Sequence, residues 1–204
     1  ARLAIAQQPL PLRFVVIGPV PPPFHGGAVA TSYVLSSEVT RQWRVLHHDI
    51  TDRRGLENIG RLEAGNVVLA LRHAAGFLRL LITQRPALVY LALAQNTLAV
   101  LRDATFILPA LLLQRRVVIH LHAGGFRTYY ESASAPMRVL LRFMLSRATR
   151  VIVLGEALRE SVAGLVDAQR IAVLPNGIAD MFPTVPARAE RSSPTRVLFL
   201  GNLM

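Results

Sequence analysis

Six short apolar runs, rich in β-branched residues, recur along the 204-residue chain, and longer stretches of helical character separate them. Most runs are continuously apolar rather than alternating, which is typical of parallel strands buried on both faces. The runs span residues 13–18, 43–49, 87–94, 116–122, 150–155 and 170–175. Helices are expected over residues 28–40, 61–84, 97–114, 135–147 and 156–166. Because strand and helix alternate, the chain is predicted to form an α/β fold with a parallel sheet and right-handed crossovers.

The segment after Pro175 differs in composition from the rest of the chain. It is rich in proline, small residues and charge, as linkers are, and it leads into a strand-like run, "RVLFLGNLM". We therefore predict a tail over 1–12, one domain over 13–182, a linker over 183–194 and the first strand of a second domain over 195–204. An apolar strand without a sheet of its own invites edge pairing, so a homodimer through 195–204 is expected.

Composition excludes several classes of protein. The absence of cysteine excludes a disulfide scaffold, a thiolate metal site and a cysteine nucleophile. All 23 basic residues are arginine, which codon bias explains as readily as function does, while the net charge of +11 favours an anionic partner. Only 6% of residues are aromatic and no arginine cluster is interleaved with them, so nucleic acid is not an expected partner.

Ligands of open parallel sheets bind at the carboxyl ends of the strands, so the loops after the strands are informative. The loop after the first strand, "GPVPPPFHGGA", lacks the G-x-G-x-x-G fingerprint, which disfavours nicotinamide and flavin enzymes. Gly26 and Gly27 instead stand where the next helix starts. There, unpaired N–H groups and the absence of Cβ favour the close approach of an anion. An ordinary tight connection is the alternative interpretation.

The fourth strand ends in "HLHAGGF", which places His120 and His122 on the same side of the strand. No third ligand lies nearby in sequence, so a metal site is not expected. His120, inside the strand, is interpreted as a hydrogen-bonded core histidine. His122 stands at the strand end before two glycines, where a titratable side chain would meet a substrate.

Polar residues at the other strand ends give weaker indications. Gln95 and Asn96 follow the third strand, where they would bind a polar ligand or cap the next helix. Glu156 follows the fifth strand, where a carboxylate stabilises a first helical turn whatever the function. Asn176 and Gly177 form a common turn pair after the sixth strand.

Together these loops resemble the N-terminal half of family 4 retaining glycosyltransferases of the GT-B fold. The matching sequences are "PPPFHGGA", "HLHAGG", "VIVLGEALRE", "VLPNGI" and "RVLFLGNL". The resemblance implies two Rossmann-like domains facing each other, of which residues 13–182 form the acceptor-side one. It implies transfer of a sugar from a nucleotide sugar to a glycan, lipid-linked or small-molecule acceptor with retention of configuration. No cofactor is expected, and the implied role is cell-envelope polysaccharide biosynthesis.

The same resemblance implies roles for residues at the strand ends. It places His122 near the transferred sugar as the catalytic residue. The positions implied near the donor phosphate or sugar are Gly26, Gly27, Asn176, Gly177 and Gly201. The positions implied for the acceptor are His25, Gln95, Asn96, Gly124, Gly125 and Glu156.

The chain also departs from the family's pattern. Gly155 stands where the family often has serine, and Ala179 precedes Asp180 where an aspartate is usual. The family's E-x7-E carboxylates belong to the second domain, so the 204-residue chain is expected to be inactive alone. Another GT-B enzyme, such as a nucleotide-sugar epimerase or a phosphorylase, is an alternative.

A membrane-binding module is a further alternative from a different class. Residues 135–150 combine arginines with apolar side chains, as in helices that lie on anionic membranes, although a helix packed on the sheet has the same pattern. No run reaches the about 20 apolar residues that a spanning helix needs. The protein is therefore expected in the cytoplasm, either free or peripheral at the inner face of the membrane.

Overall fold

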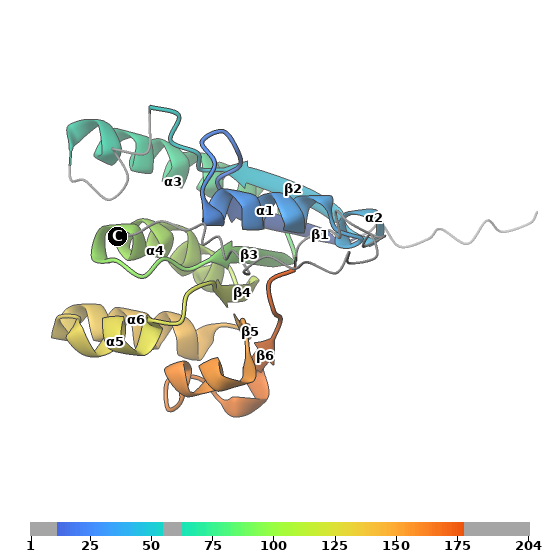
Figure 1. Ribbon diagram of the computed structural model, residues 1–204. Coiled ribbons are helices and arrows are strands. Elements are labelled where there is room, and N and C mark those ends of the chain that lie inside the picture. The colour runs from blue at the N-terminus through green and yellow to red at the C-terminus, as the bar shows by residue number, and fades with distance from the viewer. Residues whose placement is uncertain (1–11, 55–62, 178–204) are drawn as a thin grey trace, which may run out of the picture.

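The structure, a computed structural model, describes residues 12–54 and 63–177 (Figure 1). It contains a six-stranded sheet in the order β2-β1-β3-β4-β5-β6, and every pairing is parallel. The strands are β1 Arg13–Gly18, β2 Arg44–Asp49, β3 Leu88–Ala92, β4 Arg116–Leu121, β5 Arg150–Val153 and β6 Ile171–Val173. Helices flank this sheet, so the predicted α/β, Rossmann-like fold is confirmed.

The helices follow the expected stretches with three differences. Their bounds are α1 Gly26–Ser36, α2 Val39–Gln42, α3 Ala64–Gln84, α4 Thr97–Leu112, α5 Phe126–Ser132 and α6 Ala135–Arg147, with 3-10 helices η2 Glu156–Val162 and η3 Ala168–Arg170. The helix expected over 28–40 is divided, because the backbone N–H and the hydroxyl of Ser37 both donate to the carbonyl of Val34. Helix α5 occupies a stretch outside the expected helices. The helix expected over 156–166 is a 3-10 helix.

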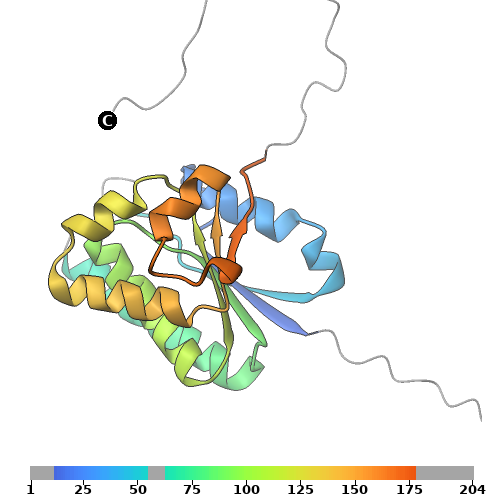
Figure 2. The ribbon, with the colours of Figure 1, turned by 90° about the horizontal axis from the view of Figure 1, so that it is seen from below.

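The strand order determines which face of the sheet each helix covers. The step from β1 to β2 runs in one direction along the sheet, and the following steps run in the other. Because crossovers are right-handed, α3, α4 and α6 cover one face and α1 covers the opposite face. Figure 2 shows this separation, with α1 on the far side of the sheet from α4 and α6.

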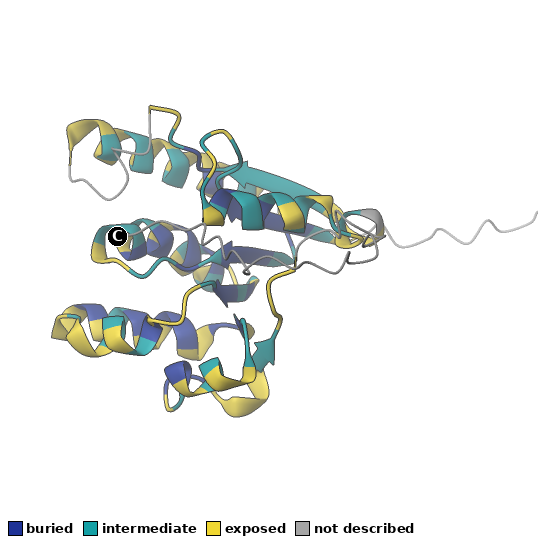
Figure 3. Cartoon of the chain, in the orientation of Figure 1, coloured by how far each residue is buried: buried dark blue, intermediate teal, exposed yellow. Residues whose placement is uncertain are grey.

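The main core lies between the sheet and the layer of α3, α4 and α6. Val15 and Ile17 of β1 point into it, whereas Phe14 and Val16 pack with Tyr90 under α1. Phe77 of α3 and Phe106 of α4 are fully buried, with ring centroids 5.4 Å apart. This alternation confirms that β1 is buried on both faces, as its continuous apolar sequence predicts. Figure 3 shows the central strands β1 and β3 as buried, whereas the edge strands β2 and β6 are largely intermediate.

Several predictions fall on residues that the structure does not describe. They are the tail over 1–12 except Leu12, the end of the main domain beyond 177, the linker, the strand over 195–204 with its homodimer, and Gly201. These stay predictions.

Candidate functional site

The loops that follow β1, β3 and β4 begin at the same level on one edge of the sheet. In the parallel register Ile17 pairs with Leu91, and Leu91 pairs with Ile119. Only β3 separates β1 from β4, so β1 and β4 lie about 10 Å apart. The start of α1 and the residues after β4 therefore belong to a single rim, which we call the carboxyl rim.

The proline loop between β1 and α1 is anchored to the end of β2. The backbone N–H of Val20 donates to the hydroxyl of Thr51 at 2.9 Å. The Nε2 atom of His47 lies 2.9 Å from the carbonyl oxygen of Gly18. These bonds, together with the fixed φ angles of the prolines, hold the loop in one position above the rim.

Helix α1 begins at Gly26 and Gly27, as the sequence predicts. His25 is its N-cap, and Nδ1 of His25 accepts a hydrogen bond from the N–H of Ala28 at 3.4 Å. A Cβ atom added to Gly26 would meet nothing within 4 Å, and one added to Gly27 would meet only the His25 ring at 3.4 Å. Neither glycine has a positive φ. The described fold therefore does not require glycine at these two positions, and the space beside them is open.

His122 contacts a residue that lies far from it in sequence. Its half-buried side chain lies beside Asn176, which follows β6. Burial lowers the pKa of His122, and the neighbouring Asn176 side chain acts in the opposite direction. Two residues that the resemblance assigned to the site, from separate loops, thus meet at the carboxyl rim.

His120 lies directly beneath His122, with ring centroids 3.9 Å apart. Its side chain is buried, and its Nδ1 atom lies 2.7 Å from the hydroxyl oxygen of Tyr90. Burial raises the pKa of Tyr90 and lowers the pKa of His120 to about 4, with a smaller lowering from the neighbouring His122. Both side chains are therefore neutral near pH 7, and one donates to the other across this 2.7 Å contact, in the direction that the His120 tautomer sets.

The interpretation of His120 as a hydrogen-bonded core residue is confirmed. Its Nε2 atom has no hydrogen-bond partner among the residues that the structure describes. Sequence reasoning missed Tyr90, which looked like one more apolar residue of its strand. Its position in the strand was the available signal, because alternate residues of a strand point to opposite faces of the sheet. Tyr90 and His120 both fall on the face that α1 covers.

The polar residues after β3 have structural partners. Nε2 of Gln95 donates to the carbonyl of Ala123 at 2.9 Å, which joins the loops after β3 and β4. Oδ1 of Asn96 accepts from the N–H of Ala99 at 2.9 Å, so Asn96 is the N-cap of α4. Of the two roles left open for Asn96, the structure shows the cap.

The remaining predicted residues lie at the same rim but are not joined to His122 by any described contact. A Cβ on Gly124 would lie 3.4 Å from Leu158, and one on Gly125 would lie 3.6 Å from Oε1 of Gln95. Glu156 is exposed and forms an ion pair with Arg159 at 2.6 Å. A Cβ on Gly177, the last residue before 178–204, would meet no atom within 4 Å among the described residues. Within 12–54 and 63–177, no three His, Cys, Asp or Glu side chains converge as metal ligands do.

A comparison with known protein families gives a match over residues 8–177 to the glycosyl transferase 4-like domain. The chain belongs to this family. The match ends at Gly177, so this glycosyl transferase 4-like domain includes the whole described sheet and the His122–Asn176 contact. No curated protein matches the chain.

Membership confirms the resemblance stated from the strand-end sequences. The chain is a glycosyltransferase domain with the architecture of the N-terminal half of a GT-B enzyme. The carboxyl rim of this glycosyl transferase 4-like domain is where its candidate site lies, because the residues after β4 and β6 come together there and the loop after β1 begins at the same level.

Proposed function

We propose that this glycosyl transferase 4-like domain is the acceptor-side half of an enzyme that transfers a sugar from a nucleotide sugar with retention of configuration. A single observation carries the proposal. Two glycines that the fold does not require begin α1, at the same rim as the half-buried imidazole of His122. An enzyme that brings a diphosphate close to bare backbone has a use for such glycines, and the fold alone has none.

The start of α1 has the hydrogen-bonding capacity that a donor diphosphate needs. His25 accepts two hydrogen bonds at this helix end: its side chain accepts from the N–H of Ala28, and its carbonyl accepts from the N–H of Val29. Among the described residues, no acceptor is bonded to the N–H groups of Gly26 and Gly27. Unpaired N–H groups at a helix N-terminus, together with the positive end of the helix dipole, favour a phosphate.

In this proposal His122 orients the transferred sugar and is not a nucleophile. As a half-buried imidazole beside Asn176, it would offer a ring nitrogen to a sugar hydroxyl. Asn176 and Gly177 would lie near the hinge to a second domain, which would supply most donor contacts, including Gly201. The acceptor would lie among His25, Gln95, Asn96, Gly124, Gly125 and Glu156.

The proposed chemistry follows from retention without a protein nucleophile. The bond between the anomeric carbon and the phosphate oxygen breaks, and the acceptor oxygen bonds to the same face of that carbon. The departing phosphate takes the proton of the acceptor hydroxyl. The proposed reaction uses neither a metal nor a cofactor. We propose that it takes place in the cytoplasm, in cell-envelope polysaccharide biosynthesis.

The deciding experiment adds one methyl group at the start of α1. Gly26→Ala should leave the melting temperature unchanged or slightly higher, because alanine is the better helix residue and the new methyl would meet no side chain within 4 Å among the described residues. Nucleoside diphosphate release should fall by about tenfold or more, since a Cβ would displace the diphosphate. The assay uses the longer protein that the second-domain prediction implies, with a panel of nucleotide sugars.

The matched control adds a methyl group away from the rim. Gly76→Ala lies within α3 with its nearest neighbour, a His48 ring carbon, at 3.4 Å, and should retain full turnover. Unchanged turnover in Gly26→Ala would reject the donor site. The 204-residue chain alone should show no turnover, and turnover by this chain would reject the two-domain proposal.

A further inference from the structure

The layer of α3, α4 and α6 has an apolar side that the core does not use. Ten of the 17 large hydrophobic side chains exposed among the described residues lie on these three helices. We call these ten side chains the outer helical face. They are Val67, Val68, Leu71, Leu78 and Ile82 of α3, Leu101, Leu108 and Leu112 of α4, and Val139 and Phe143 of α6.

Helix α3 is the most apolar part of this face. It is the one described helix long and apolar enough to cross a membrane, since an 18-residue segment of it has a mean hydropathy of 1.3. Only 11% of that segment is buried in the structure. Phe77 and Leu81 are fully buried, so α3 lies on the sheet as a layer helix. A second stripe at Val68, Leu71, Ala75, Leu78 and Ile82 recurs every three or four residues and faces outward.

Helices α4 and α6 extend the apolar surface across the layer. Leu101, Leu108 and Leu112 share the outward side of α4, and Leu112 is 83% exposed. On α6, Val139 is 69% exposed and Phe143 lies one turn further. The opposite sides of both helices pack into the main core. The outward residues therefore play no part in that packing.

The charges on the three helices are almost all positive. Their sequences contain six arginines, namely Arg72, Arg79, Arg102, Arg138, Arg142 and Arg147. Their one carboxylate, Asp103, is buried and bonded to Arg102 at 2.8 Å. The outer helical face thus combines exposed hydrophobic side chains with cationic neighbours, and apart from Glu63, the exposed N-cap of α3, the three described helices place no exposed carboxylate beside it.

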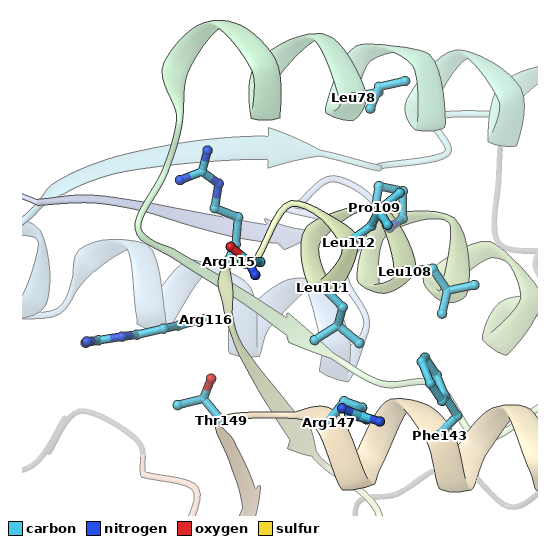
Figure 4. Close-up of a pocket in the computed structure, with 11 residues that line it drawn as sticks. Leu78, Leu108, Pro109, Leu111, Leu112, Arg115, Arg116, Phe143, Arg147 and Thr149 are labelled. Atoms are coloured by element: carbon cyan, nitrogen blue, oxygen red, sulfur yellow. The ribbon is translucent and has the colours of Figure 1, made fainter.

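A groove crosses this face between the C-terminal turns of α4 and α6. It has a volume of about 990 Å³ and is lined by apolar side chains, including Leu78, Leu108 and Phe143, and by Arg115 and Arg147. Figure 4 shows Leu111 and Phe143 pointing into the space between the two helices. The guanidinium of Arg147 lies 5.8 Å from the centre of the Phe143 ring. The groove therefore offers apolar walls and cationic groups together.

We propose that the outer helical face binds the surface of an anionic phospholipid bilayer, with α3, α4 and α6 lying along the interface. Apolar side chains would enter the headgroup region, and the arginines would pair with lipid phosphates. A second copy of the chain fits this face less well, because it would oppose arginines to arginines. The proposal goes beyond sugar transfer and does not depend on it.

The test is flotation of the 204-residue chain with vesicles. Vesicles of phosphatidylcholine containing phosphatidylglycerol are compared with pure phosphatidylcholine vesicles, at about 0.1 M and about 1 M salt, where the Debye length falls from about 10 Å to about 3 Å. Binding should require the anionic lipid and should weaken at high salt. Because no nucleotide or turnover enters the assay, its outcome is separate from that of the proposed transferase.

Two pairs of variants separate this face from net charge and general hydrophobicity. Arg138→Gln with Arg142→Gln should weaken binding by about fivefold for each arginine. The matched pair Arg44→Gln with Arg53→Gln removes the same charge from β2 and the loop after it, and should bind as the parent does. Leu71→Gln with Leu112→Gln should also weaken binding, whereas Tyr33→Gln with Val39→Gln on α1 and α2 should not. All eight positions are exposed or half-buried at the surface, and thermal melting checks that each variant folds.

Three results would overturn the proposal. One is no flotation with anionic vesicles at low salt. Another is equal weakening by the two arginine pairs, which would show attraction through net charge alone. The third is a dimer in sedimentation that Leu71→Gln with Leu112→Gln converts to a monomer, while vesicle binding by that variant is unchanged. This result would show that the outer helical face serves self-association.

Discussion

Gly18 and Gly26 stand at either end of the same proline loop, yet they are glycine for different reasons. A Cβ on Gly18 would lie 2.3 Å from Oγ1 of Thr31, so its absence lets α1 pack closely on the end of β1. The hydroxyl of Thr31 in turn donates to the carbonyl of Gly27 at 2.9 Å. Gly18 therefore serves the packing that positions the start of α1, whereas Gly26 has no such neighbour.

Gly18→Ala should accordingly reduce the free energy of unfolding by about 1–3 kcal/mol, the usual cost of overpacking. Urea unfolding of the variant measures this. Gly18→Ala combined with Thr31→Ala should recover part of the loss, because the second change removes the atom that the new methyl meets. Strictly additive effects of the two substitutions would contradict the contact.

Among the elements, α4 shows how a residue at the rim can serve the fold. Asn96 caps α4, and the pattern of polar residues after β3 did not distinguish this role from acceptor binding. The cap uses Oδ1 of the side chain, which leaves the amide nitrogen available to an acceptor. Substitutions that keep or remove the oxygen separate the two roles.

Asn96→Ala should lower the free energy of unfolding by about 1 kcal/mol through loss of the cap. Asn96→Asp keeps a capping oxygen and should retain stability. If the amide nitrogen also binds the acceptor, Asn96→Asp will raise the KM for the acceptor at unchanged stability. Thermal melting and acceptor titration of the longer protein give the two readouts, and an Asn96→Ala variant as stable as the parent would refute the cap.

For the molecule as a whole, burial of imidazoles makes stability depend on pH. Burial lowers the pKa of five histidines below the usual value of 6.5, namely His25, His48, His73, His120 and His122. Below that pH the unfolded chain binds protons that the folded chain does not. Stability from these groups is therefore complete above about pH 6.5 and is lost as the pH falls.

His120, with a pKa of about 4, should contribute the most to this loss, about 3 kcal/mol between pH 6.5 and pH 4. Urea unfolding at a series of pH values measures the slope. His120→Gln removes the titrating group and should flatten that slope, although the variant is less stable at pH 7. A slope identical to that of the parent would show that His120 titrates normally in the folded protein.

The alternation of strand and helix was readable from the sequence because it depends on local periodicity. Continuous apolar runs identified the six strands to within a few residues, and Gly26 was correctly placed at the start of a helix. Helix α5 was missed because its seven residues, "FRTYYES", are too short and too polar to show a periodic pattern.

Contacts between distant residues required the folded chain, because strand order and register decide them. His122 and Asn176 meet only because β4, β5 and β6 are parallel neighbours whose ends share one rim. Tyr90 reaches His120 for the same reason across β3 and β4. The outer stripe of α3 also required the folded structure. Composition shows that this helix is apolar, but only its packing shows which of its sides the core leaves uncovered.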